Sequence, residues 1–146
     1  MTTGRHIPLS QDAALVVALA GTAIPFAHSA EDEAERWLRA MRLHGQVGST
    51  LQALGVGESP LMTGSEHDHS GGHGTPNLGP DVLDEATRRA TDFAQARNAD
   101  NVGTTDILFA VLDVYGKLFD RALYMRGTSR DELVERLTAA ASSRAN

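Results

Sequence analysis

The segment from Val102 to Leu112 constrains the fold of this chain more than any other. Gly103 and Thr104 come shortly before a dense apolar run that begins at Ile107. Threonine is a common N-cap residue, and a cap followed by an apolar run is typical of a helix that starts at a loop and enters a core. We therefore predict a buried central helix with Thr104 as its N-cap.

Composition favours a single all-α domain. The 146 residues suffice for one domain with its own core and are too few for two ordinary domains. Only 5% of the residues are aromatic, and the alternation of apolar and polar residues typical of strands is hard to find. The net charge of -6 is spread along the chain, so we expect neither a nucleic-acid partner nor a membrane partner. Cysteine is absent, which excludes disulfides and thiolate chemistry and fits a reducing compartment.

Apolar residues recur at intervals of three and four along most of the chain, and caps and helix breakers divide this pattern into about seven helices. Ser10, Ser29 and Ser129 are the predicted N-caps, Gly45 ends the second helix, and Gly55 suits a left-handed C-cap. The helices are expected near residues 10–24, 29–44, 47–54, 79–97, 104–112, 118–126 and 129–138.

The same pattern predicts which side chains form the core. Trp37 and Phe109 lie on apolar stripes and are predicted to be buried. The helix that begins near Pro80 has one apolar face, which consists of Val82, Leu83, Ala86, Ala90, Phe93 and Ala94. The chain is small and polar from Ala139 onwards, and we expect it to fray there.

The second half of the chain repeats the pattern of the first half at a shift of 70 positions. Keeping this phase across a loop favours a duplicated helical unit whose two copies pack face to face. The matched pairs are Ala20 with Ala90, Trp37 with Ile107, Leu38 with Leu108, Ala40 with Ala110 and Met41 with Val111 and, after two inserted residues, Leu51 with Leu123 and Gly55 with Gly127.

These motifs carry a family resemblance. The Ala-rich helix, the Arg97-Asn98 turn, the Val102-Gly103-Thr104 segment and the apolar run after it resemble one repeat of the N-terminal domain of Clp-family AAA+ unfoldases. The end of the first unit, Leu51-Gln52-Ala53-Leu54-Gly55-Val56, resembles the Leu-Gly-Val pattern that closes such a repeat. The resemblance implies an all-α fold of two pseudo-symmetric helical repeats.

The resemblance also implies a division of the chain. The parts are an N-terminal arm at residues 1–8, a first, degenerate repeat at 9–57, a His- and Gly-rich linker at 58–77, a second repeat at 78–142 and a tail at 143–146.

The chain departs from the family pattern in ways that bear on function. Thr105-Asp106 stands where the family has Glu-His, and the fourth helix of the first repeat is replaced by the linker. No Gly-x-x-x-x-Gly-Lys-[Ser/Thr] motif occurs, so the sequence offers no cradle for nucleotide phosphates. Ser10 and Ser129 are explained as caps and lie in no nucleophile-elbow pattern. We therefore expect a binding protein without enzymatic activity and without a cofactor.

In the resembled domains, the cleft near the start of each repeat takes peptides, adaptors and, in actinobacterial members, cyclic peptide antibiotics. Position by position, this implies Val17 in the first repeat and Gly79, Asp84 and Arg88 in the second as ligand-binding residues. Gly79 replaces an aromatic residue that the family often has there. The implied partners are peptides, substrates, adaptors or Clp ATPase and protease components, and the implied role is to modulate Clp-dependent proteolysis in the cytoplasm.

Two other interpretations stay open. Glu66-His67-Asp68-His69 and the nearby His73 could hold Zn, Ni or Cu, which would make the chain a metal-binding protein. The apolar run from Ala13 to Ala27, which is followed by small residues, resembles a secretory signal peptide, so the chain could be a secreted helical protein. Ser10-Gln11-Asp12 before this run favours a helix N-cap over the basic segment that a signal peptide requires.

Overall fold

The structure is a computed structural model that describes residues 7–56 and 81–145. These residues form seven α-helices, one short 3-10 helix and no strand, which confirms the predicted all-α class and the predicted number of helices. The elements are α1 (Gln11–Ala23), η1 (Ile24–Phe26), α2 (Ala30–Arg42), α3 (Gly45–Ala53), α5 (Asp81–Ala96), α6 (Thr104–Tyr115), α7 (Lys117–Met125) and α8 (Arg130–Ala145).

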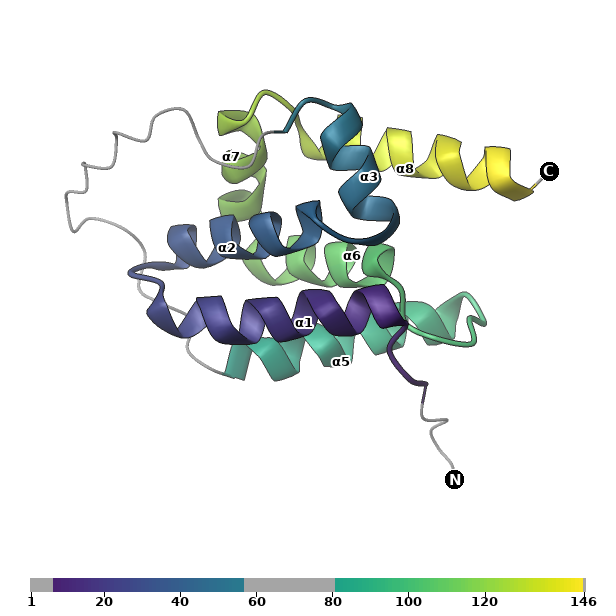
Figure 1. Cartoon of the computed structure of the whole chain (residues 1–146), viewed down its shortest axis with the longest axis horizontal. Helices are drawn as coiled ribbons and strands as arrows, with labels where there is room; N and C mark the ends of the chain where they lie inside the picture. Colours follow the sequence, from purple (N-terminus) through teal and green to yellow (C-terminus); the bar gives the residue numbers. More distant parts are fainter. Residues whose placement is uncertain (1–6, 57–80, 146) are drawn as a thin grey trace.

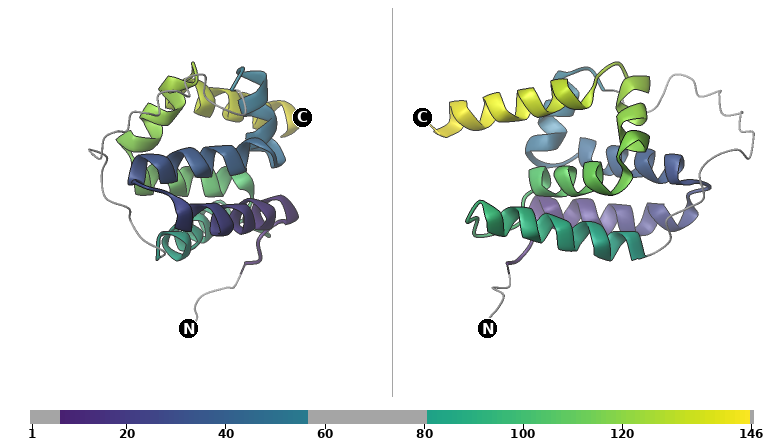
Figure 2. Two further views of the ribbon diagram at one scale, coloured as in Figure 1. Left: turned by 60° about the vertical axis from the view of Figure 1, so that its left-hand side comes forward. Right: turned by 180° about the vertical axis from the view of Figure 1, so that it is seen from behind.

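The helices are arranged in layers, and α2 and α6 form the middle layer (Figure 1). α1 and α5 run antiparallel on one side of this layer, and α3, α7 and α8 lie on the other side (Figures 1 and 2). The two middle helices contribute the largest part of the core. Their fully buried side chains are Trp37, Leu38 and Met41 on α2 and Ile107, Leu108 and Val111 on α6.

The first helix belongs to this core and is not a separate apolar segment. Ala13, Val16 and Ala20 are fully buried, and Ser10 caps the helix through the N–H of Ala13, as predicted. The residues before α1 are also attached to the fold, because the N–H of Val102 donates to the carbonyl of Pro8 at 2.9 Å. The end of the predicted irregular arm therefore packs against the loop between α5 and α6.

The N-cap of α6 is Gly103, and the prediction of Thr104 at this position is wrong. The carboxylate of Asp106, three residues further along, accepts the N–H of Gly103 at 2.9 Å. This bond satisfies a backbone donor at the start of α6. Thr104 is buried, and its hydroxyl accepts the N–H of Val47 at the start of α3 at 3.4 Å. The Thr104 side chain therefore bonds to α3 and does not cap its own helix.

Gly45 allows this close approach. It is the first residue of α3, whereas the sequence predicted it as the end of the preceding helix. A Cβ atom at this position would lie 2.6 Å from the Thr104 hydroxyl, and the φ angle of +70° is one that favours glycine. Glycine is therefore required here by both space and backbone conformation.

The C-terminal helix is longer than predicted. α8 begins after Ser129, whose hydroxyl accepts the N–H of Glu132, as the sequence indicated. It then continues to Ala145, past the position near 138 where the sequence predicted the helix to end. Alanine is the best helix former, and its frequency near the end of the chain explains the extension.

The two halves contain helices in the same order, with α1, α2 and α3 followed by α5, α6 and α7. Each matched apolar pair is buried on both sides, for example Trp37 with Ile107 and Leu51 with Leu123. Gly55 and Gly127 both have positive φ angles, +86° and +88°. The duplication itself stays a prediction. The linker predicted between the units, residues 58–77, lies outside the described residues.

A buried chain of hydrogen bonds connects the two middle helices. The hydroxyl of Tyr115, the last residue of α6, donates to the carboxylate of Glu33 on α2 at 2.9 Å. The same hydroxyl accepts the indole N–H of Trp37 at 3.1 Å. All three side chains are buried, so the hydroxyl satisfies two polar groups that water does not reach.

Replacing Tyr115 with Phe is expected to destabilise the fold without changing it. The variant keeps the ring but removes a partner from both the indole N–H and the carboxylate, which should lower the free energy of unfolding by about 1–3 kcal/mol. Urea denaturation followed by circular dichroism measures the change. Tyr124→Phe is the control because Tyr124 is 78% exposed, and its effect should stay within about 0.5 kcal/mol. Equal effects of the two variants would contradict the role of the buried hydroxyl.

The same hydroxyl makes stability fall at alkaline pH. Burial, reinforced by the bond to Glu33, raises the pKa of Tyr115 above its ordinary value of 10.0. In the unfolded chain the group ionises near pH 10, whereas in the fold it stays protonated. Its contribution is therefore complete below pH 10 and is lost above it at about 1.4 kcal/mol per pH unit. Unfolding curves between about pH 8.5 and 11 should show a shallower loss for Tyr115→Phe than for the wild type. Identical slopes would refute this.

Candidate functional site

An open cavity of about 980 Å³ lies where the N-terminal ends of α1, α3 and α6 meet α5 and α8. Ser10 and Asp12 line it from α1, Gln46 from α3, and Thr105 from α6. The starts of α1 and α6 lie at the same end of the molecule because these two helices run in the same direction (Figure 1). The start of α3 is attached there by the hydrogen bond between Val47 and Thr104. We call this cavity, together with the aromatic residues described next, the α5–α6 groove.

Two phenylalanines form the apolar wall of the groove. Phe93 on α5 and Phe109 on α6 face each other with ring centroids 6.0 Å apart and planes tilted by 60°. Phe93 is 37% exposed, and Phe109 is only partly buried. The prediction that Phe109 is a core residue is therefore only partly right, since its ring packs against the core but is only partly buried.

An ion pair at the start of α6 also lines this cavity. Asp106 is almost completely buried, and its carboxylate accepts two hydrogen bonds from Arg97, one of them from Nε at 2.9 Å. These bonds raise the pKa of Arg97 above its already high ordinary value, so the guanidinium stays charged. About half of the Arg97 side chain, 53%, is exposed. The pair thus anchors a cation at the rim of the groove.

A second, smaller cavity of about 310 Å³ adjoins the first through Phe93. Its remaining lining is charged. Arg88 and Arg89 both bind Glu85, and Arg89 also binds Asp113 of α6. The hydrogen bonds from Arg89 and then Arg88 lower the pKa of Glu85, which therefore stays ionised. Phe93 lines both the α5–α6 groove and this charged cavity.

The ligand residues implied by the resemblance are only partly placed at these cavities. Arg88 lines the smaller one, and its ion-pair partner is Glu85, not Asp84. Asp84 is exposed on α5, and Val17 is half-buried on α1; neither lines either cavity. Gly79 lies outside the described residues. The Phe93–Phe109 wall was not predicted as a site, because an apolar stripe that faces a groove has the same spacing as one that faces the core.

The metal interpretation falls on a different part of the chain. His67, His69 and His73 lie outside the described residues. Residues 7–56 and 81–145 contain no group of three or more His, Asp or Glu side chains arranged to hold a metal ion. Among the helices described, none combines the length and the apolar character needed to cross a membrane.

No protein-family model matches the sequence, and no curated protein matches it.

Asp106 should be the most important single side chain for the integrity of the groove. Asp106→Ala removes the acceptor of the Gly103 N–H and the buried partner of Arg97, and we expect a loss of about 2–3 kcal/mol in the free energy of unfolding. Asp113→Ala is the matched control. Its ion pair with Arg89 lies at the surface and should be worth at most about 1 kcal/mol. Urea denaturation of both variants measures the difference, and a larger loss for Asp113→Ala would show that the cap is not the main contribution.

Proposed function

We propose that this protein is a non-catalytic binding domain, similar in role to Clp unfoldase N-domains, that takes extended peptide segments of substrates or adaptors. The observation that carries the proposal is the position of Phe93 between the apolar α5–α6 groove and the charged cavity. An aromatic anchor beside charged groups suits a peptide that offers one apolar side chain and neighbouring polar ones.

The chemistry of the groove favours binding over catalysis. The Ser10 hydroxyl accepts the N–H of Ala13, which makes it a helix cap. Asp106 is occupied by Gly103 and Arg97. These polar groups stabilise helix ends, and a general base would have to be free to accept a substrate proton.

Rigid walls also favour binding. Phe93 and Phe109 project from α5 and α6, which pack against each other along most of their length. A preformed site on helices loses little conformational entropy when a ligand enters it. Because the chain has no nucleotide-binding motif, its effect on Clp-dependent proteolysis would come from competition for peptides or from their delivery, not from unfolding.

Polypeptide binding can be tested with reduced, carboxymethylated α-lactalbumin, which stays unfolded in native buffer. We expect a fluorescein-labelled sample to gain anisotropy when the protein is added. Phe93→Ala should weaken the binding by about fivefold or more, since truncation of a central aromatic anchor typically costs over 1 kcal/mol.

Tyr124→Ala provides the control for this experiment. Tyr124 is an exposed aromatic residue on α7 and lines neither cavity. We expect the control variant to bind as the wild type does. Absence of binding by the wild type, or equal weakening by Phe93→Ala and Tyr124→Ala, would refute the proposed function.

A further inference from the structure

Arg97 is the only Lys or Arg among the described residues that line the α5–α6 groove. Its guanidinium is held by Asp106 through Nε and Nη2. The two partners differ in exposure, because the side chain of Arg97 is 53% exposed and that of Asp106 only 2%. A ligand in the groove would therefore contact the cation, while the carboxylate that neutralises it stays buried.

The ion pair uses only one edge of the Arg97 guanidinium. Arginine has five N–H donors, and the bonds to Asp106 leave Nη1 without a partner among the described residues. Asp106 also accepts the N–H of Gly103, so its charge is shared between two donor groups. A guanidinium that is already held in place loses little side-chain entropy when it binds a second acceptor. The open edge of Arg97 thus suits a carboxylate.

This open edge lies one helical turn from the aromatic wall. Phe93 and Arg97 are four residues apart on α5, and residues at this spacing are neighbours on one helix face, with Cβ atoms about 5–6 Å apart. Both residues line the groove, and Phe109 faces Phe93 from α6. In an extended peptide, side chains two residues apart point to the same side and are separated by about 6.5 Å. The two spacings match.

Asp12 is the other exposed charged residue of the groove, and it would attract a basic ligand. Its position is less suited to select one. Asp12 belongs to α1 and is not on the helix that carries Phe93, and no described residue holds its side chain in place. Arg97 shares α5 with Phe93 and is fixed by two hydrogen bonds. The charge beside the aromatic wall is therefore the positive one.

We propose that the α5–α6 groove selects peptide segments in which a carboxylate side chain lies two residues from an apolar side chain. The apolar side chain packs on Phe93 and Phe109, and the carboxylate accepts hydrogen bonds from the open edge of Arg97. This selectivity rests on the peptide binding proposed above and names the class of peptide. The contribution of the carboxylate is modest, because the cation is half exposed and already has one partner.

Three synthetic peptides test the selectivity. Each consists of Gly and Ser around one Phe, and the position two residues after the Phe is Asp, Asn or Lys. Acetylated and amidated ends remove the terminal charges, so a chain-end carboxylate cannot replace the side chain. Titration of the full chain, followed by the amide signals in NMR spectra, measures each affinity. We expect the Asp peptide to bind about two- to fivefold more tightly than the other two at low salt, and the difference to shrink in about 0.5 M salt.

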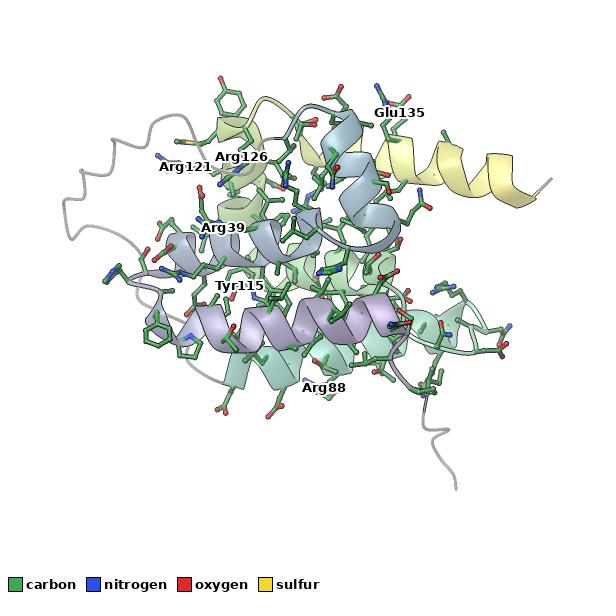
Figure 3. All side chains as sticks on the ribbon, in the orientation of Figure 1. Arg39, Arg88, Tyr115, Arg121, Arg126 and Glu135 are labelled. Carbon is green, nitrogen blue, oxygen red and sulfur yellow. The ribbon has the colours of Figure 1, made fainter. Side chains whose placement is uncertain are left out.

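Two variants of the protein assign the preference to its source. Arg97→Gln should bind the Asp and Asn peptides equally, because the neutral amide carries no charge to pair with a carboxylate. Arg121→Gln is the matched control. Arg121 is an exposed arginine on α7, on the other side of the middle layer from α5 (Figure 3). This variant should keep the preference of the wild type, and circular dichroism checks that both variants are folded.

The selectivity is overturned by equal binding of the Asp and Asn peptides, by tighter binding of the Lys peptide, or by no binding of any peptide at about 5 mM. A preference that persists in folded Arg97→Gln overturns it as well. The three peptides decide the matter with the wild type alone if Arg97→Gln does not fold. Unfolded α-lactalbumin separates this failure from failure of the proposed function: if it binds while the peptides show no preference for Asp, the groove binds peptides without selecting carboxylates.

Discussion

Polar contacts fix α6 at both ends, and the rest of the structure is arranged around that helix. At its start, Asp106 holds Gly103 and Arg97, and Thr104 holds the first turn of α3. At its end, Tyr115 joins Glu33 and Trp37 of α2. Apolar packing alone would allow helices to slide along one another, because dispersion and burial are not directional. Buried hydrogen bonds are directional, so they set the register between α6 and its neighbours.

The candidate groove is a consequence of this arrangement. The loop before α6 also binds the chain in front of α1, since the N–H of Ser10 donates to the carbonyl of Val102 at 2.8 Å. Three helices therefore begin at one place, and their first turns cannot fill the space between them as completely as side chains fill a helix–helix interface. Phe93 and Phe109 border that space, and the Arg97–Asp106 pair keeps a charge at its edge. The groove is thus bounded by residues that also stabilise the fold.

Much of the fold could be predicted from the sequence, because helix periodicity and serine caps are local signals. Ser10, Ser29 and Ser129 each accept the N–H that their positions indicate. The errors occur where tertiary contacts override a local signal. Thr104 binds α3 instead of capping its own helix, and the glycine at position 45 is required by its close approach to Thr104, not by the end of a helix. Phe93 could not be assigned to a groove from the sequence, because the residues that surround its ring are distant from it along the chain. The implied ligand residue Arg88 does line a cavity, whereas Val17 and Asp84 do not.

The sequence of α1 is compatible with more than one interpretation. Its apolar run fits both a core helix and a signal peptide, and composition alone does not separate these two interpretations. Ala13, Val16 and Ala20 are buried against the rest of the fold, so removal of the helix would expose the core beneath it. Core packing explains only that side of α1, however. Leu15, Leu19 and Phe26 face outward, where polar residues would have served the monomer as well. The apolar outer side of α1 is therefore not explained by core packing among the described residues.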